Sequence, residues 1–277
     1  MSEHIASIFG SAENFERLSE MHSQLLAAVA TYTKRDRFAD QQLTTFIPRR
    51  GLAARHNGLM IVGRAPNGWA TPWTVADIAD SSYCSKVVAA ATEEFTSTEC
   101  PMYWVEKPQD WNWKRSAFSR LMYQLTHHFL RDELIQSKRE SDEAASTKTG
   151  WYSHLIWSNL YKVAPYNGGN PGNRLCTAQE NACKNYFTSE LEIWRPRRVV
   201  LVTGWNWAEP FVNQFVSTGV NAKRSHVEWA GWIELPESKS QLPLVVCKRP
   251  EFRRAADLVT AIDSAFQALG VPPPSAN

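Results

Sequence analysis

The chain has 277 residues, of which 43% are hydrophobic and 21% are charged, a composition typical of a water-soluble globular protein with a substantial core. The formal net charge is only +2, which excludes binding to nucleic acid as a general polycation. No apolar run approaches the roughly 20 residues that a membrane span needs, and the first residues lack an export signal. The five cysteines form no CxxC pair. We therefore expect reduced thiols in a cytoplasmic monomer that is not bound to a membrane.

Hydrophobic periodicity predicts helices and strands that alternate along most of the chain. Helical spacing is found over 11–33, 74–95, 115–135, 177–193 and 251–268. Short apolar runs predict buried strands at 58–63, 154–163, 197–204 and 242–250. Thr177, with Glu180 three positions on, is the expected N-cap of one helix. A further helix is expected from Trp207.

Strands separated by helices predict a three-layer α/β/α sandwich with a four-stranded, mainly parallel sheet. We expect one domain over 1–277, with a core at about 58–268 and a helical N-terminal extension over 1–57. The polar segment 136–150 is predicted to be a mobile surface loop. Ligands of such sheets gather at the carboxyl ends of the strands. Here those ends carry Arg64-Ala65-Pro66-Asn67, Ser158-Asn159, Gly204-Trp205 and Lys248-Arg249-Pro250.

Basic residues cluster beside three of the predicted strands, where they either neutralise phosphates or form ordinary solvated surface. The clusters are Arg49, Arg50 and Arg55; Arg195, Arg197 and Arg198; and Lys248, Arg249, Arg253 and Arg254.

Several motifs follow one another in an order that resembles a known family. They are GRAPN (63–67), SNLYKVAPYNGGNP (158–171), ACKNYF (182–187), RPRRVVLVTGWNWAEPF (195–211) and KRPEFRR (248–254). The series resembles the uracil-DNA glycosylase superfamily, and its central block is similar to the thermophile-type, iron–sulfur family. The resemblance covers about 58–255 and implies DNA as the partner, with the target base either flipped out of the duplex stack or met in a single strand. Taken alone, GRAPN is equally well explained as a turn.

The departures from this family fall on its cofactor and catalytic positions. Cys183 matches one cluster cysteine, but Val163 replaces another and no amino-terminal CxxC exists, so we expect no iron–sulfur cluster, no other metal and no organic cofactor. Arg64 replaces a glutamate, Ala65 stands where related families place a water-activating residue, and Arg249 replaces a histidine. These changes predict a base other than uracil.

Hydrolysis of an N-glycosidic bond requires stabilisation of the departing base and a group that positions water. Arg249 is the candidate for the leaving base, or alternatively binds phosphate; as a permanent cation it does not act as a general acid. Asn67 is the candidate that positions water, with Asp77 and Asp80 as alternatives that are otherwise helix surface.

The resemblance also implies residues that contact the base and the DNA backbone. Asn159 matches the asparagine that binds the base edge, unless it is purely structural, and Phe118 is either the residue that stacks on the base or a core residue. The other base-side candidates are Arg64, Ala65, Pro66, Trp69 and Trp113. The backbone candidates are Lys162, Gly204, Lys248, Arg253 and Arg254.

From these residues we expect a monofunctional DNA glycosylase that leaves an abasic site. The altered motifs favour a larger or modified base; a hypermodified base of phage DNA would make the chain a defence enzyme. The first alternative is a nucleic-acid-binding relative without catalysis. The second is a hydrolase of small nucleotides, which the absence of a phosphate-cradling loop disfavours.

Overall fold

The computed structural model describes residues 8–33, 40–54, 58–67, 72–92, 100, 102, 105, 113–143, 150–221 and 226–272. The chain forms two compact units, each assembled from three separate stretches of sequence. The first contains 1–48, 64–98 and 159–193, and the second contains 49–63, 99–158 and 194–277. This partition differs from the expected extension and core, because 64–98 and 159–193 fold with the N-terminal helix.

The second unit is organised around an eight-stranded sheet with the order β2-β4-β3-β6-β10-β9-β7, in which β8 also pairs with β9. The strands are β2 (Arg49–Arg50), β3 (Leu59–Gly63), β4 (Leu155–Asn159), β6 (Arg198–Leu201), β7 (Val216–Ser217), β8 (Val220–Asn221), β9 (Val227–Glu234) and β10 (Gln241–Cys247). The pairs β3–β6 and β6–β10 are parallel, whereas β2–β4 and the pairs made by β9 are antiparallel. The prediction of a four-stranded, mainly parallel sheet is therefore wrong in size and in kind, although the four predicted strands are the neighbours β4-β3-β6-β10.

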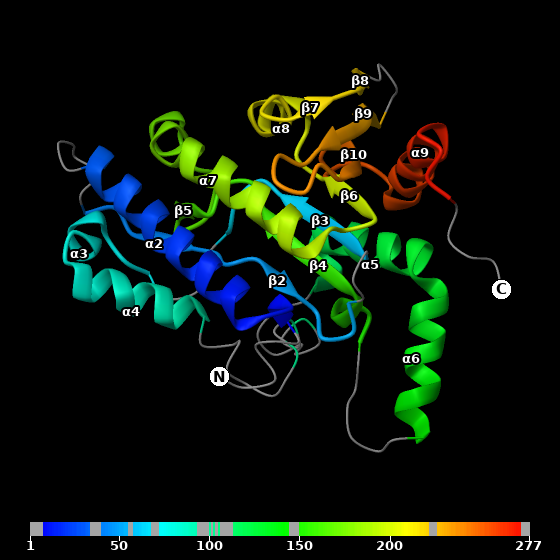
Figure 1. Cartoon of the computed structure of the whole chain (residues 1–277), viewed down its shortest axis with the longest axis horizontal. Coiled ribbons are helices and arrows are strands. Elements are labelled where there is room, and N and C mark those ends of the chain that lie inside the picture. The colour runs from blue at the N-terminus through cyan, green and yellow to red at the C-terminus, as the bar shows by residue number, and fades with distance from the viewer. Residues whose placement is uncertain are drawn as a thin grey trace. The chain divides into compact units, whose positions relative to one another are not determined.

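The helices of the second unit are η3 (Trp113–Arg115), α5 (Ala117–Phe129), α6 (Arg131–Glu143), η4 (Trp151–His154), α8 (Trp205–Val212) and α9 (Ala255–Ala268). Figure 1 shows α8 and α9 on either side of β9 and β10, as expected for a layered α/β unit. Ser116 caps α5 by accepting a hydrogen bond from the Ser119 amide. The predicted loop over 136–150 is wrong for its first half, because α6 continues to Glu143; 144–149 lie outside the described residues.

The first unit combines helices with a small sheet. It contains α2 (Ala12–Thr33), α3 (Val75–Ile78), α4 (Ser81–Thr92), α7 (Asn173–Trp194) and the antiparallel pair β1 (Leu43–Thr45) and β5 (Val163–Pro165). The single helix expected over 74–95 is two helices in the described part. The predicted cap at Thr177 is wrong, because α7 begins at Asn173 and the Thr177 hydroxyl donates to the Asn173 carbonyl.

The side chain of Gln179 fixes α7 to the small sheet. Its Oε1 accepts from the Val163 amide at 2.9 Å, and its Nε2 donates to the Val163 carbonyl at 2.8 Å. The primary amide thus pairs with the strand backbone as a neighbouring strand would. Because Gln179 is fully buried, these bonds satisfy polar groups that have no access to water.

Candidate functional site

The order of the central strands defines where a ligand is expected in the second unit. The chain runs from β3 to its neighbour β4, and then crosses to β6 on the other side of β3. Such a reversal is a topological switch point, and open α/β sheets bind ligands outside the carboxyl ends of the strands that flank it. The Val202 amide donates to the Val62 carbonyl at this point. The Gly204 amide donates to the Cys247 carbonyl at 3.0 Å, so the carboxyl ends of β6 and β10 meet as predicted.

The first turn of α8 is closed by a carboxylate. Gly204 precedes the helix with φ 78°, a conformation that favours glycine, and the Trp205 amide donates to Glu228 Oε2 at 2.6 Å. The negative charge therefore lies at the positive end of the helix dipole. The Gly204 and Trp205 amides are both used within the fold, so the predicted contact of the Gly204 amide with a DNA phosphate is not supported.

An aromatic stack lies beside this helix end. The rings of Trp205 and Trp229 are parallel to within 15°, with centroids 6.0 Å apart. Trp229 is buried under Gly219, where an added Cβ would lie 2.0 Å from the indole ring. The stack is therefore part of the packed structure that supports the carboxyl ends of β6 and β10.

The segment after β10 is a hydrogen-bonded turn that presents an aromatic side chain. The Arg253 amide donates to the Pro250 carbonyl at 3.1 Å, and Phe252 lies in the left-handed region with φ 62°. The Arg253 guanidinium donates to the backbone carbonyls of Arg249, at 2.9 Å, and Glu251, at 3.3 Å. These bonds hold the turn in place while the Phe252 ring has a relative exposure of 108%.

Basic side chains surround Phe252 on the same turn. Arg249, Arg253 and Arg254 are exposed, and Lys248 is half-buried with its amide donating to the His226 carbonyl. Arg249 Nη2 lies 2.5 Å from Glu251 Oε1, in an ion pair whose partners are both exposed. The segment 248–254 is hereafter called the basic turn. It combines cationic groups with one fully exposed apolar ring.

In the first unit, the GRAPN turn is joined to the segment that follows β4. The Arg64 carbonyl accepts from the Tyr161 amide at 2.9 Å. Asn67 Oδ1 accepts from the Gly169 amide at 3.2 Å, and Gly169 has φ 95°. Pro66 is buried, Ala65 is half-buried and Asn67 is exposed. The polar candidate Asn67 is thus held by a backbone donor rather than lying free in a loop.

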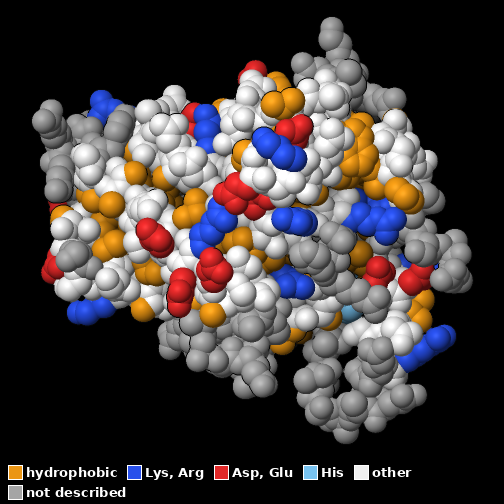
Figure 2. All heavy atoms as spheres, viewed as in Figure 1, with side chains coloured by type: hydrophobic (Ala, Val, Ile, Leu, Met, Phe, Trp, Pro, Cys, Tyr) orange, Lys and Arg blue, Asp and Glu red, His pale blue; other side chains and the backbone are white. Residues whose placement is uncertain are grey.

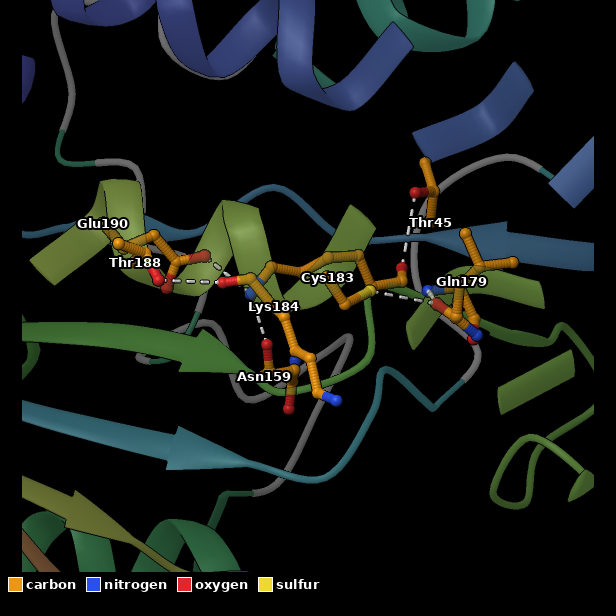
Figure 3. A network of polar contacts seen from close by, with 9 residues as sticks. Thr45, Asn159, Gln179, Cys183, Lys184, Thr188 and Glu190 are labelled. Atoms are coloured by element: carbon orange, nitrogen blue, oxygen red, sulfur yellow. Dashed lines mark hydrogen bonds and ion pairs between the residues drawn. The ribbon is translucent and has the colours of Figure 1, made fainter. Parts of the chain in front are cut away.

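Lys162 is not an exposed backbone-tracking residue, and this prediction is wrong. Its side chain is fully buried, and Nζ lies 2.6 Å from Glu190 Oε1 on α7, which is buried as well. Nζ also donates to the Asn159 carbonyl (Figure 3). Asn159 is 3% exposed at the end of β4. The charge of Lys162 is therefore used inside the unit and is not available to a phosphate.

Two further candidates have structural partners. Asp77 Oδ2 accepts from both the amide and the hydroxyl of Thr74 at 2.7 Å, which completes a capping box on α3. A role for Asp77 in positioning water is therefore not supported. Asp80 Oδ1 accepts from the Ser82 amide, and this bond lowers the pKa of Asp80.

The aromatic candidates have different outcomes. Phe118 is half-buried on α5 and packs against Trp157, with ring centroids 6.1 Å apart, which corresponds to the core alternative. Trp69 and the side chain of Trp113 lie outside the described residues.

The other two basic clusters contain residues that serve the fold. Arg49 is buried, and the Arg50 guanidinium donates to the Ala54 carbonyl. Arg198 is buried over the Phe129 ring at 4.9 Å, and its burial lowers its pKa. Arg197 is exposed at the amino end of β6. Of the three clusters, the basic turn alone places an exposed aromatic ring among its cations in the described structure.

The residue patterns did not single out Phe252, Glu190 or Glu228. The sequence did contain a sign of Phe252, because it is an aromatic residue in the mostly charged KRPEFRR (248–254). The two glutamates had no such signal, because a buried acid and an exposed acid look alike in a sequence.

No protein-family model matches this chain, and no curated protein matches it either. Among the described residues, no helix is long and apolar enough to cross a membrane. Nor do three or more His, Cys, Asp or Glu side chains of that part of the chain gather in an arrangement that would hold a metal ion.

Proposed function

We propose that this chain is a DNA glycosylase, which extrudes a damaged or modified base and hydrolyses its N-glycosidic bond to leave an abasic site. The observation that carries the proposal is the basic turn with Phe252 at its tip. An exposed apolar ring loses the benefit of burial, and a left-handed backbone at a bulky residue costs about 1–3 kcal/mol. Unfavourable features of this kind cluster at functional sites.

Insertion of an aromatic wedge into a base stack accounts for both features. Proteins that unstack DNA insert apolar side chains between base steps and hold the flanking phosphates with arginines. Phe252 is the wedge in this proposal, and Arg254 and Lys248 hold the phosphates. Because the Arg253 guanidinium already fixes the turn, little conformational entropy is lost on binding.

Arg249 is proposed to stabilise the departing base. The base leaves with negative charge, and a cation placed beside it lowers the barrier. Its ion pair with Glu251 is exposed and therefore weak, so a substrate anion can displace the carboxylate. For the first unit, taken by itself, the resemblance implies Asn67 as the group that positions water and Asn159, Arg64, Ala65 and Pro66 as contacts of a base.

A second candidate function is binding of nucleic acid without catalysis. It is favoured by one observation, that the carboxylate of Asp77 is committed to the cap of α3. With Ala65 at the position of the family's activating residue, Asn67 and Asp80 are then the remaining candidates for the hydrolytic water.

Abasic-site formation tests the proposal. DNA carrying uracil, hypoxanthine, hydroxymethylcytosine or glucosylated hydroxymethylcytosine is incubated with the protein, and abasic sites are revealed by alkaline strand cleavage. The wild type is compared with Arg249→Ala and Phe252→Gly, and with Arg197→Gln as a charge control at the amino end of β6.

We expect the wild type and Arg197→Gln to cleave at one of these bases. Loss of a group that stabilises developing charge lowers the rate about 100-fold or more, which is the expectation for Arg249→Ala. Phe252→Gly should lose duplex cleavage more than single-strand cleavage, because a single strand needs no unstacking. Binding to all four DNAs without cleavage would transfer the proposal to the second candidate function.

A further inference from the structure

An ion pair in the first unit is more deeply buried than stability alone explains. Lys162 and Glu190 both have zero exposed side-chain area, and Lys162 Nζ also lies 5.1 Å from the centre of the Tyr186 ring. Removing two charges from water costs about as much as their attraction returns, so an apolar pair of similar volume is often equally stable or more so. The pair therefore calls for an explanation other than stability.

The backbone around Lys162 is fixed from two directions. Its carbonyl accepts from the Phe46 amide at 2.9 Å and from the Thr45 hydroxyl at 3.3 Å. The next amide, of Val163, is held by Gln179 of α7. From this fixed backbone, Lys162 Nζ donates to the carbonyl of Asn159, three residues earlier in the chain.

Asn159 is the last residue of β4, where regular strand pairing ends. A charged donor on its carbonyl fixes the peptide plane that follows, and hence the direction of the residue's backbone. Glu190 in turn holds Nζ, because a buried ammonium without its counter-ion would be expelled or neutralised. The chain of contacts therefore runs from α7 through Glu190 and Lys162 to Asn159.

We infer that Lys162 and Glu190 are a positioning pair that sets the orientation of Asn159 for recognition of the base. The inference rests on the proposed function, in which Asn159 contacts the base edge. Lys162 and Glu190 touch no substrate in this account. They act through the Asn159 backbone, and their contribution is to the choice of base and to the rate of excision.

The test replaces the pair by an apolar pair, Lys162→Met with Glu190→Met. This double variant removes both buried charges together and keeps similar volume, so its denaturation midpoint should equal or exceed that of the wild type. Lys162→Met alone strands the Glu190 charge and should lower the midpoint. The matched control is Lys184→Met with Glu180→Met, which removes a half-buried pair at 2.7 Å on α7, the helix that carries Glu190.

We expect the double variant to lose about 100-fold in kcat/KM on the preferred base, the effect of a misplacement of about 1 Å. Its preference for that base over the other three should shrink, because Asn159 no longer has a fixed direction. Binding to undamaged DNA should not change, since the basic turn is intact. The control variant should retain wild-type rate, base preference and midpoint.

Wild-type kcat/KM and base preference in a folded double variant would overturn the positioning role and leave the proposed function standing. Wild-type kcat/KM at temperatures below the double variant's unfolding transition, with a loss only above it, would overturn the positioning role as well. The pair would then serve stability alone. Absence of cleavage by the wild-type protein on every base removes the proposed function, and the positioning role falls with it.

Discussion

At Phe252, the side chain that the proposed function requires is unfavourable for the stability of the fold. Phe252 is the third residue of a turn in which the Arg253 amide donates to the Pro250 carbonyl. When φ is positive at this position, as it is here, glycine is the preferred residue. A phenylalanine there strains the backbone and buries none of its ring. The side chain therefore contributes nothing to the folded state that would offset its cost.

Replacing Phe252 with glycine should leave the free energy of unfolding unchanged or raise it by up to about 1.5 kcal/mol. Relief of the left-handed strain is worth about 1–2 kcal/mol, and the greater freedom of glycine in the unfolded chain subtracts about 0.5–1 kcal/mol. Urea denaturation of the two proteins measures the difference. A loss of more than about 1 kcal/mol would mean that the ring packs in solution, and would contradict its role as an exposed wedge.

Sequence patterns predicted some of the candidate residues and misjudged others. Asn67, Arg249 and Arg254 could be proposed from the sequence because strand ends and basic runs are visible in the chain, and the described structure places Arg249 and Arg254 on one exposed turn. Lys162 was misassigned because a lysine after a predicted strand carries no mark of burial. The charge of Lys162 is paired inside the unit with Glu190, which is distant in the sequence.

At the scale of elements, prediction succeeded where burial is complete. Every residue of β3 and β6 is buried, and such strands have continuous apolar runs that stand out in a sequence. The strand β9 has half-buried residues among its buried ones, and β7 is exposed, so neither has a continuous run. The part of α6 from 136 to 143 was taken for a loop because its sequence, QSKRESDE, is polar throughout.

The contact of α2 with β1 and α7 depends on a histidine that stays neutral. His22 Nε2 lies 2.8 Å from the Thr45 hydroxyl, and the His22 ring meets the Tyr186 ring edge-on. Burial, and then the nearby charge of Lys162, lower the pKa of His22 from 6.5 to about 3. The folded unit thus excludes a proton that the unfolded chain binds below about pH 6.5.

Acid should therefore destabilise the protein through His22. As the pH falls from 6.5 towards 3, the unfolded chain gains a proton that the folded chain does not, and at pH 4 this amounts to about 3 kcal/mol. His22→Gln keeps a donor for Thr45 without titrating, so its unfolding free energy should fall less steeply with acid. Urea denaturation from pH 7 to pH 4 measures both slopes, with His127→Gln on the exposed side of α5 as control. Parallel slopes for the wild type and His22→Gln would show that His22 is not the group responsible.

The whole molecule carries little net charge, and Figure 2 shows acidic and basic side chains interspersed over the described part of one face. The described part of this face offers DNA no broad positive surface. The proposal assigns DNA binding to the basic turn, where the positive charges of Lys248, Arg249, Arg253 and Arg254 are partly offset by Glu251. A small, local set of cations gives a measurable signature in the salt dependence of affinity.

The logarithm of DNA affinity should fall with the logarithm of salt concentration with a slope of about −2, the value for the two phosphate-binding cations Lys248 and Arg254 at about 0.9 per phosphate. Arg254→Gln should reduce that slope by about 0.9 and weaken binding evenly across sequences. Arg197→Gln removes the same charge at the amino end of β6 and should leave the slope unchanged. Fluorescence anisotropy with labelled duplex DNA, repeated over a range of salt concentrations, provides the slopes. Equal reductions of the slope by the two variants would mean that DNA binds over the whole surface. That result would contradict binding at the carboxyl ends of the strands.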